Sequence, residues 1–556
     1  MRDFLEKGTN ILFRRQTNIL SAAFVLMVAV GLSSVLGILR DRLLYARFYA
    51  CCSQQLDAYL AAFRIPDMIF QLVVLGAMSS AFIPVFSGLL EKDKHEADLT
   101  ASSFINIVGV VFLFLGTIFF IFAKPISEAI TGSFTPDQIN LMTSLTRIML
   151  ISQFFFLLSN FATAIIQTHQ RFLVPALSPL IYNLSIIAGL YFFSNISGIY
   201  GPAIGVVVGA FLHFLIQLPL SWRLGFRHKW NFDLKLPGVR QIGKLMLPRT
   251  VSLAVSQIEL TFSLFVTTAL APGSLAIFNL AQNLMSLPVR LVGTTIGQAT
   301  LPALSRDYSR KELPEFKSIL VKSLLELMYL ALPASSILLV LRIPLVRIAF
   351  GTKTFPWQAT LLTGRVLEFF FLAIFTQAAI QLLVRAFYAI HNTKIPLIIG
   401  SFSVAINVGL AIFLTFNLNW GVIGLAAANS VSSLIQALLL LIALDYKLNR
   451  FNRTELFLPF FKMCAASFLC AIFLWLPMHL LDKFLLDTTR TINLIILTTA
   501  ASLVGILVYL GLSRLLQIDE LHSYLALARK IGRWQEVLKE SGEVIETAAT
   551  PTTPKL

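Results

Sequence analysis

The chain has 556 residues, of which 57% are hydrophobic and only 13% are charged, against roughly 25% charged residues in an average globular protein. A water-soluble protein of this length lacks the polar residues to cover its surface, so the composition excludes a soluble fold and predicts a membrane protein. The net charge of +16 would suggest nucleic-acid binding in a soluble chain. Here the basic residues lie mostly between apolar runs, which favours anionic membrane lipids as partners and argues against nucleic acid.

Fourteen apolar runs are long enough to cross a membrane. The hydrocarbon core of a bilayer is about 30 Å thick, and roughly 20 residues of α-helix cross it. We expect helices because backbone groups inside hydrocarbon must hydrogen-bond within their own segment. The runs lie near residues 19–38, 68–90, 102–123, 142–166, 175–194, 202–221, 245–269, 275–300, 318–341, 361–384, 396–416, 421–443, 460–478 and 492–512.

The basic residues predict the orientation of the chain. The loops at 222–244 and 306–322 are rich in Lys and Arg, whereas the loops at 195–201, 270–274 and 417–420 contain neither. Because Lys and Arg concentrate in cytoplasmic loops, we expect a multi-pass protein of the cell inner membrane with both termini in the cytoplasm. The predicted organisation is a cytoplasmic N-terminus (1–18), an N-lobe of spans 1–6 (19–221), a basic linker (222–244), a C-lobe of spans 7–12 (245–443), spans 13–14 (460–512) and a cytoplasmic tail (513–556).

An internal duplication is indicated by matches at a nearly constant offset. Residues 81–87 resemble residues 299–305, and residues 215–217 are repeated at 434–436. The repeat contains six spans, and an even number returns the chain to its starting side of the membrane. We therefore expect an all-α polytopic fold of about 14 helices, with two parallel six-helix lobes plus two extra C-terminal helices. Such lobes are typical of transporters that rock around a central cleft.

Charged residues next to the first two spans are candidate ligands for an anionic headgroup. An ionisable side chain at the centre of a membrane helix costs roughly 2.5–3.5 kcal/mol, so it requires a cavity or a partner. Arg40 and Asp41 follow span 1, where they can pair, and Asp57 and Arg64 precede span 2, seven residues apart on one helix face. The alternative is that both groups are solvated residues at the membrane interface.

Deeper charged residues are the second set of candidates. Arg290 in span 8 is the most central cation, and Glu259 in the middle of span 7 is a carboxylate that should be paired or neutral there. Arg365 and Glu368 lie one turn apart in span 10 and can pair with each other. For Arg147 and Arg365 the alternative is that the side chain reaches the membrane interface.

No motif for catalysis or for binding a metal is found, so we expect neither an enzyme nor a cofactor, and any energy must come from an ion gradient, the membrane potential or the substrate itself. Four cysteines, Cys51, Cys52, Cys464 and Cys470, are interpreted as small apolar residues. Three glycines spaced four apart in span 6 predict close helix packing, and residues 519–539 predict an amphipathic helix on the cytoplasmic surface.

Three segments carry a resemblance to a known family. Ser34–Asp41 (SVLGILRD), Asp57–Pro66 (DAYLAAFRIP) and 76–86 (GAMSSAFIPVF) resemble the signature of the MurJ/MviN lipid II flippases, a branch of the multidrug/oligosaccharidyl-lipid/polysaccharide exporter superfamily. The resemblance implies two six-helix lobes in a V and a hydrophobic groove formed by spans 13 and 14. It also implies a cationic central cavity that holds the pyrophosphate and sugars of a lipid-linked glycan while the polyprenyl tail stays in the groove.

The chain departs from the family pattern at several charged positions. Neutral residues stand at Ser34, Phe70, Leu75, Gln282, Asn283 and Ser286. The resemblance therefore assigns the headgroup cavity to Arg40, Asp41, Asp57 and Arg64. Arg290, with Glu259 or Glu368 as a cavity or coupling carboxylate, is the candidate replacement for the missing charges.

Three functions are consistent with these observations. The first is a flippase that moves lipid II, or a related polyprenyl-linked glycan, from the cytoplasmic to the periplasmic leaflet, coupled to the membrane potential or a monovalent ion. The second is a cation-coupled exporter of another lipid-linked glycan or a small amphipathic molecule, which requires a buried carboxylate such as Glu259 or Glu368. The third is a non-transporting scaffold that binds the cell-wall synthesis machinery.

Overall fold

The computed structural model describes residues 19–75, 81–169, 171–352, 354–484 and 491–531, and the regular elements in these ranges are all helices. Eleven of them are long and apolar enough to cross a membrane. The predicted all-α polytopic fold is therefore confirmed. The helix α2 (Ile19–Ala62) and the shorter apolar helix Leu253–Thr268 are additional to these eleven. The predicted total of fourteen spans is consistent with these helices and stays a prediction. The predictions for residues 1–18, 76–80 and 532–556 lie outside the described residues.

The chain forms two compact units. Unit 1 comprises Met1–Leu284, Ile343–Phe370 and Leu397–Gln436, and unit 2 comprises Met285–Arg342, Phe371–Pro396 and Ala437–Leu556. These boundaries differ from the predicted N-lobe and C-lobe, whose limits stay a prediction.

Nearly all of the helices that lie wholly in unit 1 come from the first half of the chain. They are α2, α3 (Arg64–Phe70), η1 (Gln71–Leu75), α4 (Ile83–Lys92), α5 (Lys94–Ile121), α6 (Ala123–Ile130), α7 (Pro136–Thr168), α8 (Leu173–Ala188), η3 (Gly189–Phe193), α9 (Ser194–Ser197), α10 (Tyr200–Leu215), α11 (Leu218–Arg223), α12 (Pro237–Thr268) and, from later in the chain, η5 (Phe413–Asn417). Five helices contribute residues to both units: α13 (Ser274–Pro288), α16 (Arg342–Phe350), α17 (Trp357–Ala389), α18 (Lys394–Ile412) and α19 (Val422–Lys447).

Helix α2 is longer than the sequence predicts. It continues through Arg40 and Asp41 and is interrupted only at Cys52, where φ is −149° and ψ is 45°. Both Asp57, on the arm after this kink, and Arg64, at the start of α3, therefore precede the predicted start of span 2 at residue 68 but are already helical. The helices thus extend beyond the predicted spans because hydropathy ends a span at its first charges, whereas these charges find partners inside the bundle; the membrane boundaries at residues 38 and 68 stay a prediction.

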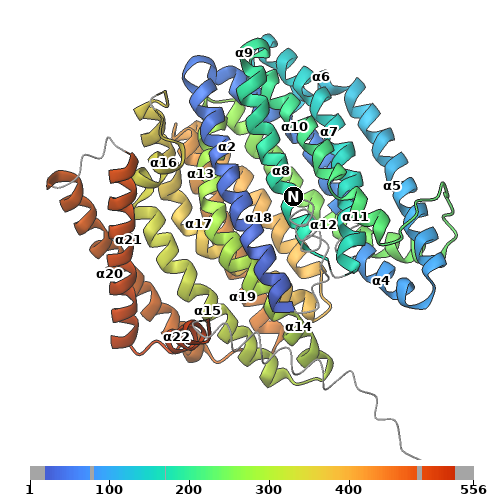
Figure 1. Cartoon of the computed structure of the whole chain (residues 1–556). Helices are drawn as coiled ribbons and strands as arrows, with labels where there is room; N and C mark the ends of the chain where they lie inside the picture. Colours follow the sequence, from blue (N-terminus) through green and yellow to red (C-terminus); the bar gives the residue numbers. More distant parts are fainter. Residues whose placement is uncertain (1–18, 76–80, 170, 353, 485–490, 532–556) are drawn as a thin grey trace, which may run out of the picture. The chain divides into compact units, whose positions relative to one another are not determined.

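Close packing of α8 against α10 fixes one wall of unit 1, and the two helices lie side by side in Figure 1. A Cβ atom on Gly205 would lie 2.7 Å from the carbonyl oxygen of Ser185, and one on Gly209 would lie 2.9 Å from the ring of Tyr182. Only residues without a side chain fit this contact, so the predicted packing role of the glycine row is confirmed.

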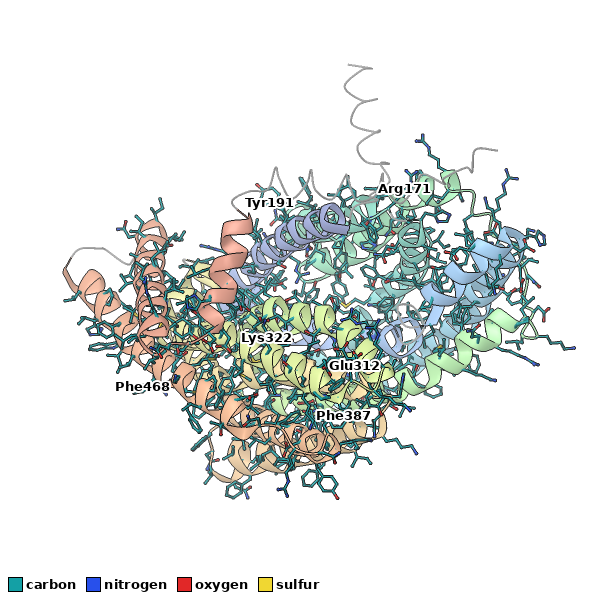
Figure 2. The ribbon with its side chains drawn as sticks, turned by 90° about the horizontal axis from the view of Figure 1, so that it is seen from below. Arg171, Tyr191, Glu312, Lys322, Phe387 and Phe468 are labelled. Atoms are coloured by element: carbon teal, nitrogen blue, oxygen red, sulfur yellow. A yellow bond between two sulfur atoms is a disulfide. The ribbon has the colours of Figure 1, made fainter. Side chains whose placement is uncertain are left out.

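Unit 2 is built around α15 (Leu313–Val340), which packs on α14 (Thr295–Ser309) and α20 (Arg453–Phe484). Helix α20 packs in turn on α21 (Thr491–Leu515), and η4 (Val289–Thr294) precedes α14. Phe468, labelled in Figure 2, is 68% exposed on α20, as expected for a side chain that contacts lipid. Helix α22 (Glu520–Ile531) confirms a helix in the described part of residues 519–539.

The cysteines differ from the sequence interpretation at one pair. Cys51 and Cys52 form a disulfide beside the kink of α2, so they are not simply small apolar residues. Cys464 and Cys470 are free thiols, and Cys470 is buried as interpreted.

Candidate substrate cavity

Unit 1 contains an open cavity of about 750 Å³ that brings together side chains from α2, α3, η1, α7, α8, α10, α12 and α13. Its charged lining residues are Arg40, Asp41, Arg64 and Asp67, so their formal charges cancel. The family resemblance implies a cationic cavity, whereas the formal net charge of this lining is zero. Many other lining groups are amides and hydroxyls, which can hydrogen-bond sugar or peptide groups: Tyr59, Gln71, Gln153, Asn160, Thr163, Tyr182, Asn279, Gln282 and Asn283.

Arg40 and Asp41 form an ion pair on the α2 wall of the cavity. The guanidinium Nη2 of Arg40 lies 2.7 Å from Oδ1 of Asp41, and Nη1 donates to Oδ1 of Asn183 at 3.1 Å. The side chains are 26% and 13% exposed, respectively. The predicted pairing of these neighbours is confirmed, and the interpretation of both as solvated interfacial residues is wrong.

Arg64 is held differently, by neutral groups of α12. Its Nε donates to the hydroxyl of Thr261 at 2.9 Å, and its Nη2 donates to the carbonyl and side-chain oxygens of Gln257 at 2.7 and 2.6 Å. These acceptors carry no charge, so the only opposite charge found to interact with Arg64 among the described residues is that of Asp67, three residues on, which forms no direct salt bridge with it. Arg64 is thus the cation of the cavity whose guanidinium is less directly paired, since Arg40 is bonded to Asp41.

Two polar features of the lining were not predicted. The amide of Gln153 donates to Asp67 at 3.0 Å, which holds this carboxylate one helical turn after Arg64. On α10, Nδ1 of His213 lies 2.6 Å from the hydroxyl of Ser159, which also accepts from Gln217 at 2.7 Å. A lone histidine in an apolar helix gives no sequence signal for such a network.

Asp57 does not line the cavity. Its carboxylate accepts hydrogen bonds from the backbone amides of Gly273 at 2.6 Å and Ala276 at 3.0 Å, at the start of α13. These amides would otherwise lack partners at the helix N-terminus, so Asp57 caps α13 from another part of the chain. This geometry gives Asp57 a structural role in place of the predicted contact with a headgroup.

The deeper candidates also lie outside the residues that line the cavity. Glu259 accepts hydrogen bonds from the side-chain amides of Asn407 at 2.8 Å and Asn429 at 3.2 Å, within unit 1. Glu368 is half-buried on α17. Arg290 belongs to unit 2, is exposed, and donates to the hydroxyl of Ser286 at 2.6 Å. Its predicted place in the headgroup cavity stays a prediction.

Several of the neutral substitutions fall in the cavity wall. Phe70, Gln282 and Asn283 all line the cavity, at positions where the family resemblance leads one to expect charge. Their neutrality explains why the lining is not cationic. Within the described part of the chain, no three His, Cys, Asp or Glu residues come together in a group that could hold a metal ion.

The comparison with protein families decides the relationship. A family model described as "Lipid II flippase MurJ" matches residues 51–495. The chain belongs to this family. A probable lipid II flippase MurJ of Bdellovibrio bacteriovorus is 28% identical over 431 residues, covering 76% of this chain and 81% of the relative. A probable lipid II flippase MurJ of Buchnera aphidicola subsp. Acyrthosiphon pisum is 27% identical over 514 residues, covering 91% and 99%.

Solved structures support the same relationship. A lipid II flippase MurJ in an inward closed conformation has a TM-score of 0.73 at 27% identity and covers 89% of this chain and 99% of that chain. An inward-facing multidrug resistance transporter of the MATE family has a TM-score of 0.61 at 13% identity, covering 76% and 98%, which shows a common fold alone. The chain is thus a multi-span member of a transporter family.

Proposed function

We propose that this chain is a flippase for lipid II, the polyprenyl-pyrophosphate-linked precursor of peptidoglycan, in the cell inner membrane. It would move the lipid from the cytoplasmic to the periplasmic leaflet by alternating access, with both termini in the cytoplasm. The family match over residues 51–495 carries the proposal. The common cavity of Arg40 and Arg64 supplies a physical basis for binding the headgroup.

Arg64 is proposed to make the first contact with the pyrophosphate. Its direct hydrogen-bond partners on α12 are neutral, and Asp67 of the same cavity forms no direct salt bridge with it, so the guanidinium can form two parallel hydrogen bonds to phosphate oxygens. Arg40 can join only by exchanging its bond to Asp41 for one to the substrate. That exchange keeps the empty cavity neutral and costs less than leaving an unpaired cation in a membrane protein.

The amide-rich lining is proposed to bind the sugars and the peptide. A cavity of about 750 Å³ lies within the range of roughly 300–1,000 Å³ that is common for ligand sites. Amides such as Gln153 and Asn279 can each donate and accept hydrogen bonds, which suits hydroxyl and peptide groups. Recognition would therefore depend on many neutral hydrogen bonds with Arg64 as the electrostatic centre.

A coupled exporter remains the second candidate because of Glu259. This carboxylate is enclosed by Asn407 and Asn429, a set of groups able to accept either a proton or a monovalent cation in exchange for an amide hydrogen bond. In the flippase proposal the same residue would couple lipid movement to an ion gradient or to the membrane potential. The two functions differ in the substrate, not in the coupling group.

Complementation of a strain depleted of its own lipid II flippase tests the proposal. The wild-type chain should restore growth and lipid II exposure on the periplasmic side, Arg64→Ala should not, and Arg64→Lys should restore it in part because the charge is kept without the planar fork. Arg365→Ala is the matched control, since Arg365 is exposed and outside the cavity lining. Failure of the wild-type chain at normal membrane levels would refute the lipid II assignment.

A further inference from the structure

A second cavity of unit 1 lies on another face of the same helices. It measures about 370 Å³ and is walled mostly by apolar side chains of α5, α7, α10 and α11 together with the loop that follows α11. It shares no lining residue with the substrate cavity. On its α5 side, Val110 is 53% and Leu113 is 51% exposed, so the groove is open along a helix that is long and apolar enough to cross a membrane.

The loop at the end of this groove is fixed to α5 by a buried amide. The side chain of Asn106, 7% exposed, donates to the backbone oxygens of Lys229 at 3.0 Å and Asn231 at 2.9 Å. Its oxygen lies 2.7 Å from Nε2 of His228, and the hydroxyl of Ser102 accepts from the amide of Lys229 at 3.1 Å. Both the amide nitrogen and the oxygen of the Asn106 side chain thus contact residues 228–231, and these contacts hold this irregular segment across the end of the apolar groove.

The fixed loop and the end of α11 combine positive charge with aromatic side chains. Arg223 at the end of α11 and Arg227 and Lys229 in the loop are exposed. The ammonium of Lys229 lies 3.1 Å from Nε2 of His95, and Asp98 of α5 interacts with it electrostatically, whereas the nearest acidic residue of the loop itself is Asp233. Trp222 and Trp230 line the groove and are 64% and 84% exposed. Tryptophan is enriched where hydrocarbon meets the lipid headgroups, and clustered Lys and Arg attract anionic phospholipids.

We propose that this groove binds one acyl chain of an anionic glycerophospholipid, with its phosphate placed at Arg227 and Lys229. The groove is apolar and lies in membrane helices, so a hydrocarbon chain matches it better than a polar ligand does. The basic loop at its end selects an anionic over a zwitterionic headgroup. The assignment to the cytoplasmic leaflet rests on the proposed membrane orientation, but the site itself does not depend on flippase activity.

Occupation of the groove has a structural consequence. A lipid acyl chain between α5 and the segment 226–232 would contact both. It would therefore stabilise a loop that is otherwise held by Asn106. Ligands that bind only the folded state raise its stability. Anionic lipid should therefore raise the unfolding temperature of the purified full-length chain more than zwitterionic lipid does.

The experiment measures binding of phosphatidylglycerol and phosphatidylcholine to the full-length chain by native mass spectrometry, in parallel with thermal unfolding. The wild-type chain should prefer phosphatidylglycerol by about tenfold. Arg227→Gln with Lys229→Gln should abolish this preference, because both changes leave the backbone anchors to Asn106 in place. The matched control is Lys235→Gln with Arg240→Gln, which removes the same charge. Arg227 and Lys229 alternate with the lining residues Phe226, His228 and Trp230, whereas Lys235 and Arg240 lie beyond the last lining residue, Phe232, so the control should keep the preference.

A second pair of variants tests the acyl chain. Val110→Trp should fill the groove and weaken both lipids, whereas Val208→Trp, at a position 45% exposed on α10 but outside the lining, should not. Equal binding of the two lipids to the wild-type chain, or equal losses in both charge pairs, would overturn the proposal. Unchanged lipid binding in the Val110→Trp variant would also overturn it. In a cross-linking experiment Val110→Cys should react with a photoactivatable phosphatidylglycerol, and a cross-link to a protein instead would overturn the proposal as well.

Discussion

The carboxylate of Asp57 accepts a 2.6 Å hydrogen bond from the backbone amide of Gly273, a residue 216 positions later in the sequence. Gly273 has a φ of +88°, and a Cβ atom there would lie 2.9 Å from the hydroxyl of Tyr49. Only glycine combines this backbone conformation with so close an approach. The contact joins the arm of α2 after the kink to the start of α13, and both helices line the substrate cavity.

The main expected effect of Asp57→Ala is therefore a lower stability of the protein and not a direct loss of substrate binding. The two amides at the start of α13 would lose their acceptor, and removal of a helix cap costs about 0.5–2 kcal/mol. Asp57→Asn should cost less, because one oxygen can still accept. Thermal unfolding in detergent measures the effect, with Asp137→Ala in the exposed first turn of α7 as the control. An Asp57→Ala protein of normal stability that no longer binds the lipid would restore the headgroup role predicted from the sequence.

Gly205→Ala should disturb the wall formed by α8 and α10. The new methyl group would lie 2.7 Å from the carbonyl oxygen of Ser185, so the helices must separate, and overpacking of this kind typically costs about 1–3 kcal/mol. Gly116→Ala on α5 is the control, because nothing lies within 4 Å of its added Cβ and alanine favours helix. The comparison of their unfolding temperatures checks the prediction. Equal stability of the two variants would show that the α8–α10 contact relaxes freely.

The fold and the position of two arginines could be predicted from the sequence for simple reasons. Long apolar runs imply membrane helices, because no other structure satisfies the backbone in hydrocarbon. The glycines of α10 predicted close packing since their spacing of four places them on one helix face. Arg40 and Arg64 were singled out by their place next to the first two spans, and the family resemblance assigned them to the cavity, because spacing alone left an interfacial role open.

The partners of those charges could not be predicted. Gln257, which holds Arg64, and Asn183, which holds Arg40, are distant in sequence and belong to common polar types that carry no signal alone. His213 was missed for the same reason. The continuation of α2 past residue 38 was not predicted because a hydropathy window treats Arg40 and Asp41 as two charges, whereas in the helix they form one neutral pair.

That neutral pair can be tested by a double-mutant cycle. Arg40→Ala leaves Asp41 partly buried without its main partner, and because the pair retains some exposure we expect a loss of about 1–2 kcal/mol. The double variant Arg40→Ala with Asp41→Ala should regain much of this stability, yet it should not regain lipid translocation, because the cation is absent. Unfolding and complementation are measured on the four proteins of the cycle, which are the wild type, Arg40→Ala, Asp41→Ala and the double variant. Recovery of transport in the double variant would show that Arg40 does not contact the substrate.

Glu259 offers the sharpest test of coupling. Glu259→Gln keeps a side-chain oxygen that can accept from Asn407 and Asn429, so the fold around it should be retained, but the group can no longer gain or lose a proton or bind a cation by charge. If this carboxylate couples transport, the variant should unfold normally and still bind lipid, while its translocation should lose any dependence on an imposed ion gradient or membrane potential. Lipid movement in proteoliposomes, followed with and without the gradient, provides the measurement.

Glu368→Gln is the comparison, since Glu368 is also half-buried in unit 1 but lies on α17. A Glu259→Gln protein whose rate still follows the gradient would exclude Glu259 as the coupling group and leave Glu368 as the remaining candidate.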